Sequence, residues 1–157
     1  MMKIKVIVVG KTKENFLKLG EEEFQRRLRR YLNLEWIAVR PEEISPKSNE
    51  TKIKTIEGQR IKEKIEAGEW IIVLDRRGEA LSSEQLADFF LKKMHAGVKC
   101  ITFVIGGTLG LSEELFQMAN EKLSLSQMTF THEMTRLILL EQIYRAFTII
   151  KGEKYHK

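Results

Sequence analysis

Short apolar runs rich in β-branched residues alternate with amphipathic helical patterns along this chain, and this alternation restricts the folds open to it. The runs cover residues 4–9, 34–39, 70–74 and 101–105, with a weaker one at 123–125. They are almost continuously apolar, which is typical of strands buried on both faces. We therefore predict an α/β fold, with a mostly parallel sheet and helices on both of its faces.

Three helical segments are expected between these strands. The first spans residues 14–32, and the second ends at Gly68. The third begins after a capping box formed by Ser82 and Gln85 and ends at Gly97. The inward stripe expected for the first helix consists of Phe16, Phe24, Leu28, Tyr31 and Leu32.

A fourth helix, over residues 134–150, is apolar around most of its circumference. A helix of this kind has to be covered on nearly every side. A homodimer interface is the simpler way to cover it in a chain this small, and a central position in the core is the alternative.

At 157 residues the chain has the length of one ordinary domain, so we predict a single domain over residues 1–157. Cys100 is the one cysteine and lies in an apolar run, which indicates a buried thiol and a reducing compartment. No segment has the length of a membrane span or the pattern of a secretory signal. We expect a cytoplasmic protein without a membrane partner.

The formal net charge of +5 favours acidic partners such as nucleic acid. Basic residues gather in two places: Arg26, Arg27, Arg29 and Arg30, and then Arg136, Arg145, Lys151, Lys154 and Lys157. The first cluster fits a solvated helix face equally well.

Three segments resemble ligand-binding loops. Gly10-Lys11-Thr12 has the position of a P-loop end, but Lys5 stands where that signature requires glycine, so a nucleotide hydrolase is disfavoured. Residues 105–111 form a glycine-rich turn after a strand, which fits a cofactor loop or a structural turn about equally. Residues 123–132 could hold an adenine ring or form a short strand and a helix start.

The three histidines differ in their surroundings: His95 is expected on the surface, while His132 and His156 lie in segments with other functional features. No group of histidines, cysteines or carboxylates has metal-ligand spacing, so no metal is proposed.

Taken together, several motifs resemble the 23S rRNA pseudouridine N3-methyltransferase family of the SPOUT superfamily. They are Gly58-Gln59-Arg60, Ile105-Gly106-Gly107 with Gly110-Leu111, residues 123–126, residues 141–147 and the terminal Tyr155-His156-Lys157. The resemblance implies a C-terminal trefoil knot, a homodimer, S-adenosylmethionine as methyl donor, and 23S rRNA or the ribosome as partner. A non-catalytic ribosome assembly factor on the same fold is the rival function.

The resemblance also implies site residues. Those expected to contact S-adenosylmethionine are Leu74, Gly106, Leu125, Ser126, Gln127, Met128, Thr129 and Phe130. Those expected in the active site are His132, Arg136, Arg145, Tyr155 and His156, with the C-terminal tail reaching the partner chain's cofactor pocket. The family usually has proline before the histidine, whereas this chain has Thr131, which puts the position of His132 in doubt.

Overall fold

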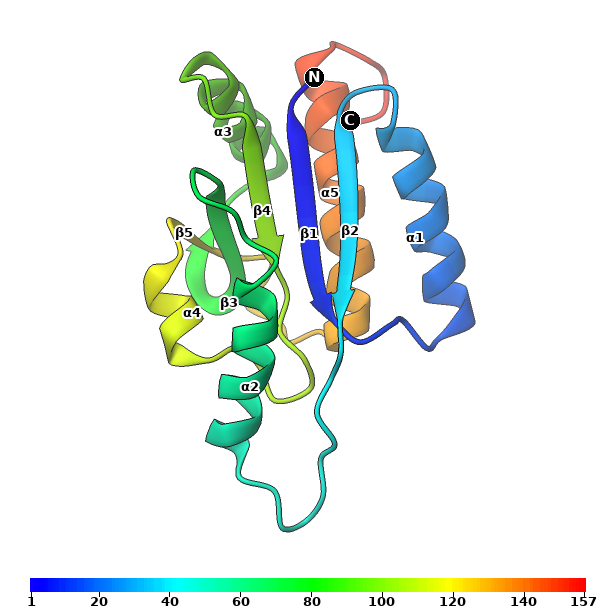
Figure 1. The fold of residues 1–157 in the computed structure, drawn as a ribbon. Coiled ribbons are helices and arrows are strands. Elements are labelled where there is room, and N and C mark those ends of the chain that lie inside the picture. The colour runs from blue at the N-terminus through cyan, green and yellow to red at the C-terminus, as the bar shows by residue number, and fades with distance from the viewer.

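A single five-stranded sheet organises the chain in the computed structural model, which describes all residues from 1 to 157 (Figure 1). The strand order is β2-β1-β4-β3-β5, and every pairing is parallel. The strands are β1 (Lys3–Val9), β2 (Asn33–Val39), β3 (Trp70–Ala80), β4 (Cys100–Val104) and β5 (Glu121–Ser124). The predicted α/β class is therefore confirmed.

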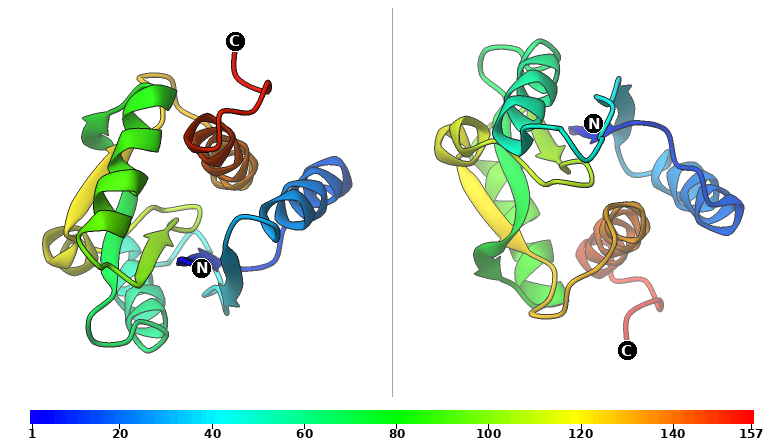
Figure 2. Two further views of the ribbon diagram at one scale, coloured as in Figure 1. Left: turned by 90° about the horizontal axis from the view of Figure 1, so that it is seen from above. Right: turned by 90° about the horizontal axis from the view of Figure 1, so that it is seen from below.

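Helices cover both faces of the sheet because alternate strand residues point to opposite faces. In β1, Ile4, Val6 and Val8 join the larger core, which is completed by α1 (Asn15–Leu28), α3 (Ser83–His95) and α5 (His132–Ile150). On the other face, Ile7 and Val9 pack with α2 (Glu50–Lys62) and α4 (Glu113–Met118). The end-on views of Figure 2 place α5 between α1 and α3.

The first helix is shorter than predicted, and its predicted inward stripe is correct except at Phe16: Leu28 and Leu32 are buried, and Phe24 and Tyr31 pack against the core. It ends at Leu28, and residues 29–32 form turns that lead into β2, whose Asn33 pairs with Lys3. Phe16 was expected inside but is 63% exposed, because Leu17 occupies the inward position of the first turn. The predicted capping box of α3 is present, and Gly97 follows the helix with a φ of +80°.

Helix α5 is flanked by α1 and α3 but is not fully enclosed. It therefore combines features of the two positions expected from the sequence, the core and an interface. Leu139, Leu140 and Ile143 are fully buried. Leu137 and Ile138 are only partly buried, and the exposed Phe16 and Leu19 lie on the adjacent α1. An apolar strip thus remains along α5 and α1 in the single chain.

The thiol of Cys100 is only half-buried, at the start of β4, and not enclosed as predicted. None of the helices combines the length and the apolar character needed to cross a bilayer.

Candidate functional site

The middle of β3 and the loops that follow β4 and β5 meet at the carboxyl edge of the sheet and line a cleft of about 750 Å³. This edge is where parallel α/β sheets bind their ligands. Leu74 to Arg76 line it from β3, Ile105 to Leu111 from the end of β4 and its loop, and Thr129 to His132 with Thr135 from the start of α5. A second cavity of about 220 Å³ adds Leu125, Ser126 and Met128 to the same region.

The glycine-rich turn after β4 is closed on itself. The amide of Gly110 donates to the Gly107 carbonyl at 3.0 Å, and Gly110 has a φ of +92°. A Cβ built on Gly106 would lie 2.7 Å from the carbonyl carbon of Gly110, so only glycine fits. The amides of Gly106, Thr108 and Leu109 donate to no acceptor within the chain. The turn therefore presents unused donors to the cleft.

The loop after β5 is held by its serines. Ser124 Oγ donates to the Ser126 carbonyl at 3.0 Å, and Ser126 Oγ accepts from the Met128 amide at 3.0 Å. The amides of Leu125 and Thr129 remain without acceptors. Seven of the eight predicted cofactor residues line these two cavities, whereas Gln127 is exposed and lines neither.

The strand pairing beside the cleft was not predicted. Strand β3 runs six residues farther than expected, and after a shift in register it meets β5 again: both Leu74 and Glu79 pair with Leu123. At the crossing, a Cβ on Gly78 would lie 2.5 Å from the Lys122 carbonyl carbon. The glycine in Arg77-Gly78 was the available signal, but spacing alone could not show which backbone it meets.

His132 begins α5 and lies in the wall of the cleft. Thr131, which stands in place of the family's usual proline, is the helix N-cap: its Oγ1 accepts from the Met134 amide at 3.1 Å. Burial, followed by the positive charge of Arg136, lowers the pKa of His132 below its ordinary value. The imidazole is therefore favoured in its neutral form.

Arg136 does not face the cleft, so we reassign the active-site role implied for it. Its side chain is fully buried, and its guanidinium donates to the carbonyls of Val9 at 2.8 Å and Gly10 at 2.9 Å and to Thr12 Oγ1 at 3.0 Å. Thr12 in turn donates to Glu21 at 2.7 Å. Arg136 thus cannot touch a nucleotide from this position, and it fixes the turn after β1 against α5.

These contacts also explain Gly10-Lys11-Thr12, which is a structural turn. Gly10 has a φ of +78°, and the Thr12 hydroxyl is occupied by Arg136 and Glu21. The disfavoured P-loop finds no support in this arrangement.

Arg145, Tyr155 and His156 form a second group at the other end of α5. Glu141 links them: it accepts from Arg145 Nη2 at 2.5 Å and from the Tyr155 hydroxyl at 3.0 Å. His156 Nδ1 lies 3.1 Å from Arg145, and its Nε2 lies 2.7 Å from Glu84. Burial and the negative charge of Glu141 raise the pKa of the Tyr155 phenol.

The two groups are separate within one chain. Arg145 comes 13 residues after His132 on the same helix, and at a rise of about 1.5 Å per residue this amounts to about 20 Å. The C-terminal tail lies against its own α5, near the end of the sheet that holds both termini (Figure 1). The structure therefore gathers the loops predicted to bind the cofactor with His132 but leaves the tail residues apart.

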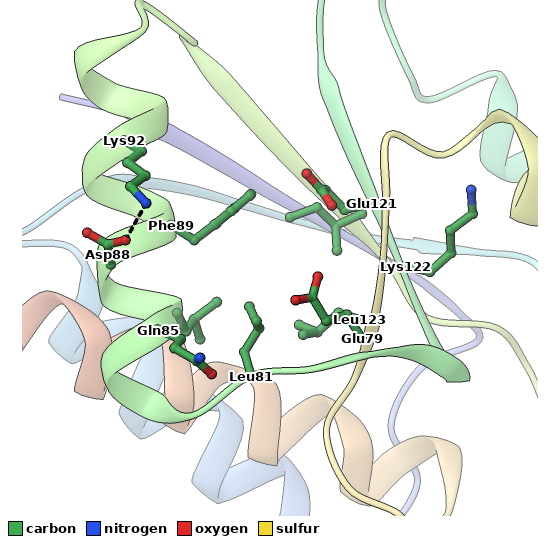
Figure 3. A pocket seen from close by; sticks show the side chains of 11 residues that line it. Glu79, Leu81, Gln85, Asp88, Phe89, Lys92, Glu121, Lys122 and Leu123 are labelled. Atoms are coloured by element: carbon green, nitrogen blue, oxygen red, sulfur yellow. Dashed lines mark ion pairs between the residues drawn. The ribbon is translucent and has the colours of Figure 1, made fainter.

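Figure 3 shows a different cavity, of about 310 Å³, between α3 and the edge strand β5. Its wall includes the ion pair of Asp88 with Lys92 and the neighbouring Glu121 and Lys122. None of the predicted site residues lines it.

The parallel α/β sheet and the cleft at its carboxyl edge define a ligand-binding α/β protein, and comparison with known proteins gives its family. A family model described as "Predicted SPOUT methyltransferase" matches residues 2–156. The chain belongs to this family.

Similar proteins are named ribosomal RNA large subunit methyltransferase H. Those from Acetivibrio thermocellus and Carboxydothermus hydrogenoformans are 46% and 48% identical to this chain, over 99% of it and 100% of their own length. A solved structure titled as a "probable methylase family protein" from Haemophilus influenzae matches 98% of this chain and 70% of its own, with a TM-score of 0.56 and 14% identity. That likeness concerns the fold alone.

Proposed function

We propose that this protein is an S-adenosylmethionine-dependent methyltransferase that methylates N3 of a pseudouridine in 23S rRNA of the large ribosomal subunit. The observation that carries the proposal is the full-length identity of 46–48% to proteins named ribosomal RNA large subunit methyltransferase H. A protein that acts on ribosomes is expected in the cytoplasm. We also propose that its C-terminal part forms a trefoil knot and that it uses no metal ion.

The cleft fits the methyl donor by the chemistry of its walls. Backbone amides without acceptors at Gly106, Thr108 and Leu125 can donate to the polar edges of the ligand, and the absence of a side chain at Gly106 lets it approach closely. Leu74, Leu125 and Phe130 offer apolar surface for the adenine ring. When bound, S-adenosylmethionine supplies an electrophilic methyl group.

The residues of the chain then have to align the base and remove a proton. N3 of pseudouridine is an imide nitrogen, a poor nucleophile until its proton leaves. His132 lies in the cleft wall and is held neutral by burial and by Arg136, so it can accept this proton. The Arg145 cation, oriented by Glu141, can bind the base or a phosphate.

A second copy of the chain completes this site. Arg145 is about 20 Å from His132 along α5, and Tyr155 and His156 lie beside Arg145 and Glu141. The apolar strip that includes Phe16, Leu19 and Leu137 is open for contact. We therefore propose a homodimer in which the tail of one protomer approaches the cleft of its partner. Sedimentation analysis tests the dimer, and a monomer at assay concentrations would contradict it.

Methyl transfer to ribosomes tests the function itself. The purified protein is incubated with labelled S-adenosylmethionine and ribosomes from a strain that lacks this modification, and the methylated nucleotide is mapped. We expect one methyl group at a pseudouridine of 23S rRNA. Calorimetry with the methyl donor accompanies the assay, because a ribosome assembly factor would associate with ribosomes without binding it. Absence of both signals would refute the proposal.

A further inference from the structure

Another cavity, of about 430 Å³, adjoins the cleft at the carboxyl ends of β1 and β2. It shares Gly107, Thr108 and His132 with the cleft, so the two spaces have a common wall. Lys11 and Lys13 are exposed at its rim. A molecule in this cavity would lie beside His132 and next to a ligand of the cleft.

Glu57 of α2 lines this cavity with one carboxylate oxygen unused. The residue is 4% exposed, and its Oε2 accepts from the Glu42 amide at 3.0 Å. Its Oε1 accepts from no donor in the chain, and a side chain at position 107 would crowd it, because a Cβ there would lie 3.1 Å away. Burial raises the pKa of Glu57. Oε1 is not among the enclosed side-chain atoms that lack a partner, so it is open to the cavity and a donor there can reach it.

The other carboxylates of the cavity are occupied or exposed. Glu42 pairs with Arg60, and Glu133 accepts from the amides of Lys13 and Glu14. Glu43 lies exposed at the rim. Glu57 is thus the buried acceptor that a ligand of this cavity would meet.

We propose that this cavity receives the target nucleobase and that Glu57 accepts a hydrogen bond from one of its ring N–H groups. The inference rests on the proposed function and specifies how the base is selected. Pseudouridine has two ring N–H groups: N3–H, which is lost on methylation, and N1–H, which uridine lacks because its N1 carries the ribose. A carboxylate can only accept hydrogen bonds, so Glu57 favours pseudouridine, whose N1–H can donate to it, over uridine.

The test compares methylation of ribosomes that carry pseudouridine or uridine at the target, with the uridine form taken from a strain unable to make the pseudouridine. In Glu57→Gln, the amide oxygen stays with the Glu42 N–H, and the NH₂ group faces the cavity. Hydrogen bonds to charged groups contribute enough to change rates by about tenfold or more. We expect wild-type kcat/KM to favour pseudouridine by at least this factor and the variant to lose most of the preference.

The matched control is Glu21→Gln. Glu21 is buried to the same degree, at 5% exposure, but its partner is Thr12 and it lines neither cavity. The ratio of the two kcat/KM values should stay at the wild-type level in this variant. Calorimetry with S-adenosylmethionine confirms that each variant is folded, and Glu57→Met replaces the glutamine variant if that one does not fold.

The outcomes separate this inference from the proposed function. A wild-type protein that methylates neither kind of ribosome refutes the function. Equal rates on pseudouridine and uridine, or an unchanged preference in the Glu57 variant, overturn the role of Glu57 while the methyltransferase function stands.

Discussion

Gly78 of β3 lies directly against the backbone of Lys122 in β5, so closely that a Cβ on Gly78 would be 2.5 Å from the Lys122 carbonyl carbon and 2.6 Å from the Leu123 nitrogen. This approach brings the end of β3 beside β5, where Leu123 pairs with both Leu74 and Glu79. Leu74 to Arg76 of β3 and Leu123 to Ser126 of β5 and its loop line the same cavity. The shape of the cleft therefore depends on the absence of a side chain at one position.

Replacing Gly78 with alanine should push the two strands apart. We expect a loss of about 1–3 kcal/mol in the free energy of unfolding, as for other overpacked interiors, and weaker binding of S-adenosylmethionine. Denaturant unfolding and calorimetry measure these. Gly20→Ala is the control, because its Cβ would meet the flexible end of Leu137. Equal stability of both variants would show that the crossing is not tight.

Neighbouring arginines at positions 76 and 77 should behave differently. Arg77 pairs with Asp75 and Glu113 and stacks on Phe116, whereas Arg76 is exposed, lines the cleft and forms no ion pair. We expect Arg76→Ala to weaken ribosome binding and to reduce the slope of log affinity against log salt concentration by about 1. Arg77→Ala should instead lower the free energy of unfolding slightly and leave the salt dependence of ribosome binding unchanged. The reverse pattern would contradict a phosphate contact at Arg76.

Replacement of the buried Arg136 by an uncharged side chain should destabilise the fold. In Arg136→Met, the carbonyls of Val9 and Gly10 lose their donor, and Glu21 loses a nearby positive charge. Loss of one partner of a buried charged network costs about 3–5 kcal/mol, which urea unfolding would detect. The same substitution should raise the pKa of His132, since the charge of Arg136 lowers it. An unchanged histidine titration in NMR would disprove this coupling.

The depressed pKa of His132 predicts a stability that declines in acid. The unfolded chain binds a proton near the ordinary pKa of about 6.5, while the folded form resists protonation because the imidazole is buried. Stability contributed by neutral His132 is therefore complete above pH 6.5 and decreases as the pH falls toward the folded pKa. His132→Gln should flatten this part of the stability curve, and an unaltered curve would exclude the histidine as its cause.

Removal of residues 155–157 should abolish methyl transfer while S-adenosylmethionine still binds. The deletion takes away Tyr155 and His156 but none of the residues that line the cleft. Ribosome methylation and calorimetry distinguish the two effects, with deletion of Lys157 alone as control. Full activity without the tail would remove it from the proposed site.

Local patterns in the sequence determined much of this protein. Five apolar runs alternating with helical patterns fixed the parallel sheet and its two helical layers, and the capping box of Ser82 and Gln85 marked the start of α3. The positions of two cleft segments, after Leu74 and after Ile105, were predictable too, because ligands of parallel sheets bind beyond the carboxyl ends of the strands. Such features depend on residues close together in the chain.

Tertiary structure alone decided what Arg136, Gly78 and Glu57 do. The sequence around Arg136 does not indicate burial, because the groups that bind its guanidinium are 124 to 127 residues away in the chain. Gly78 is explained by a crossing with Lys122, and Gly107 by the nearness of the Glu57 carboxylate. Contacts between distant segments carry no periodic signal, because their geometry is set only when the whole sheet and its helices pack together.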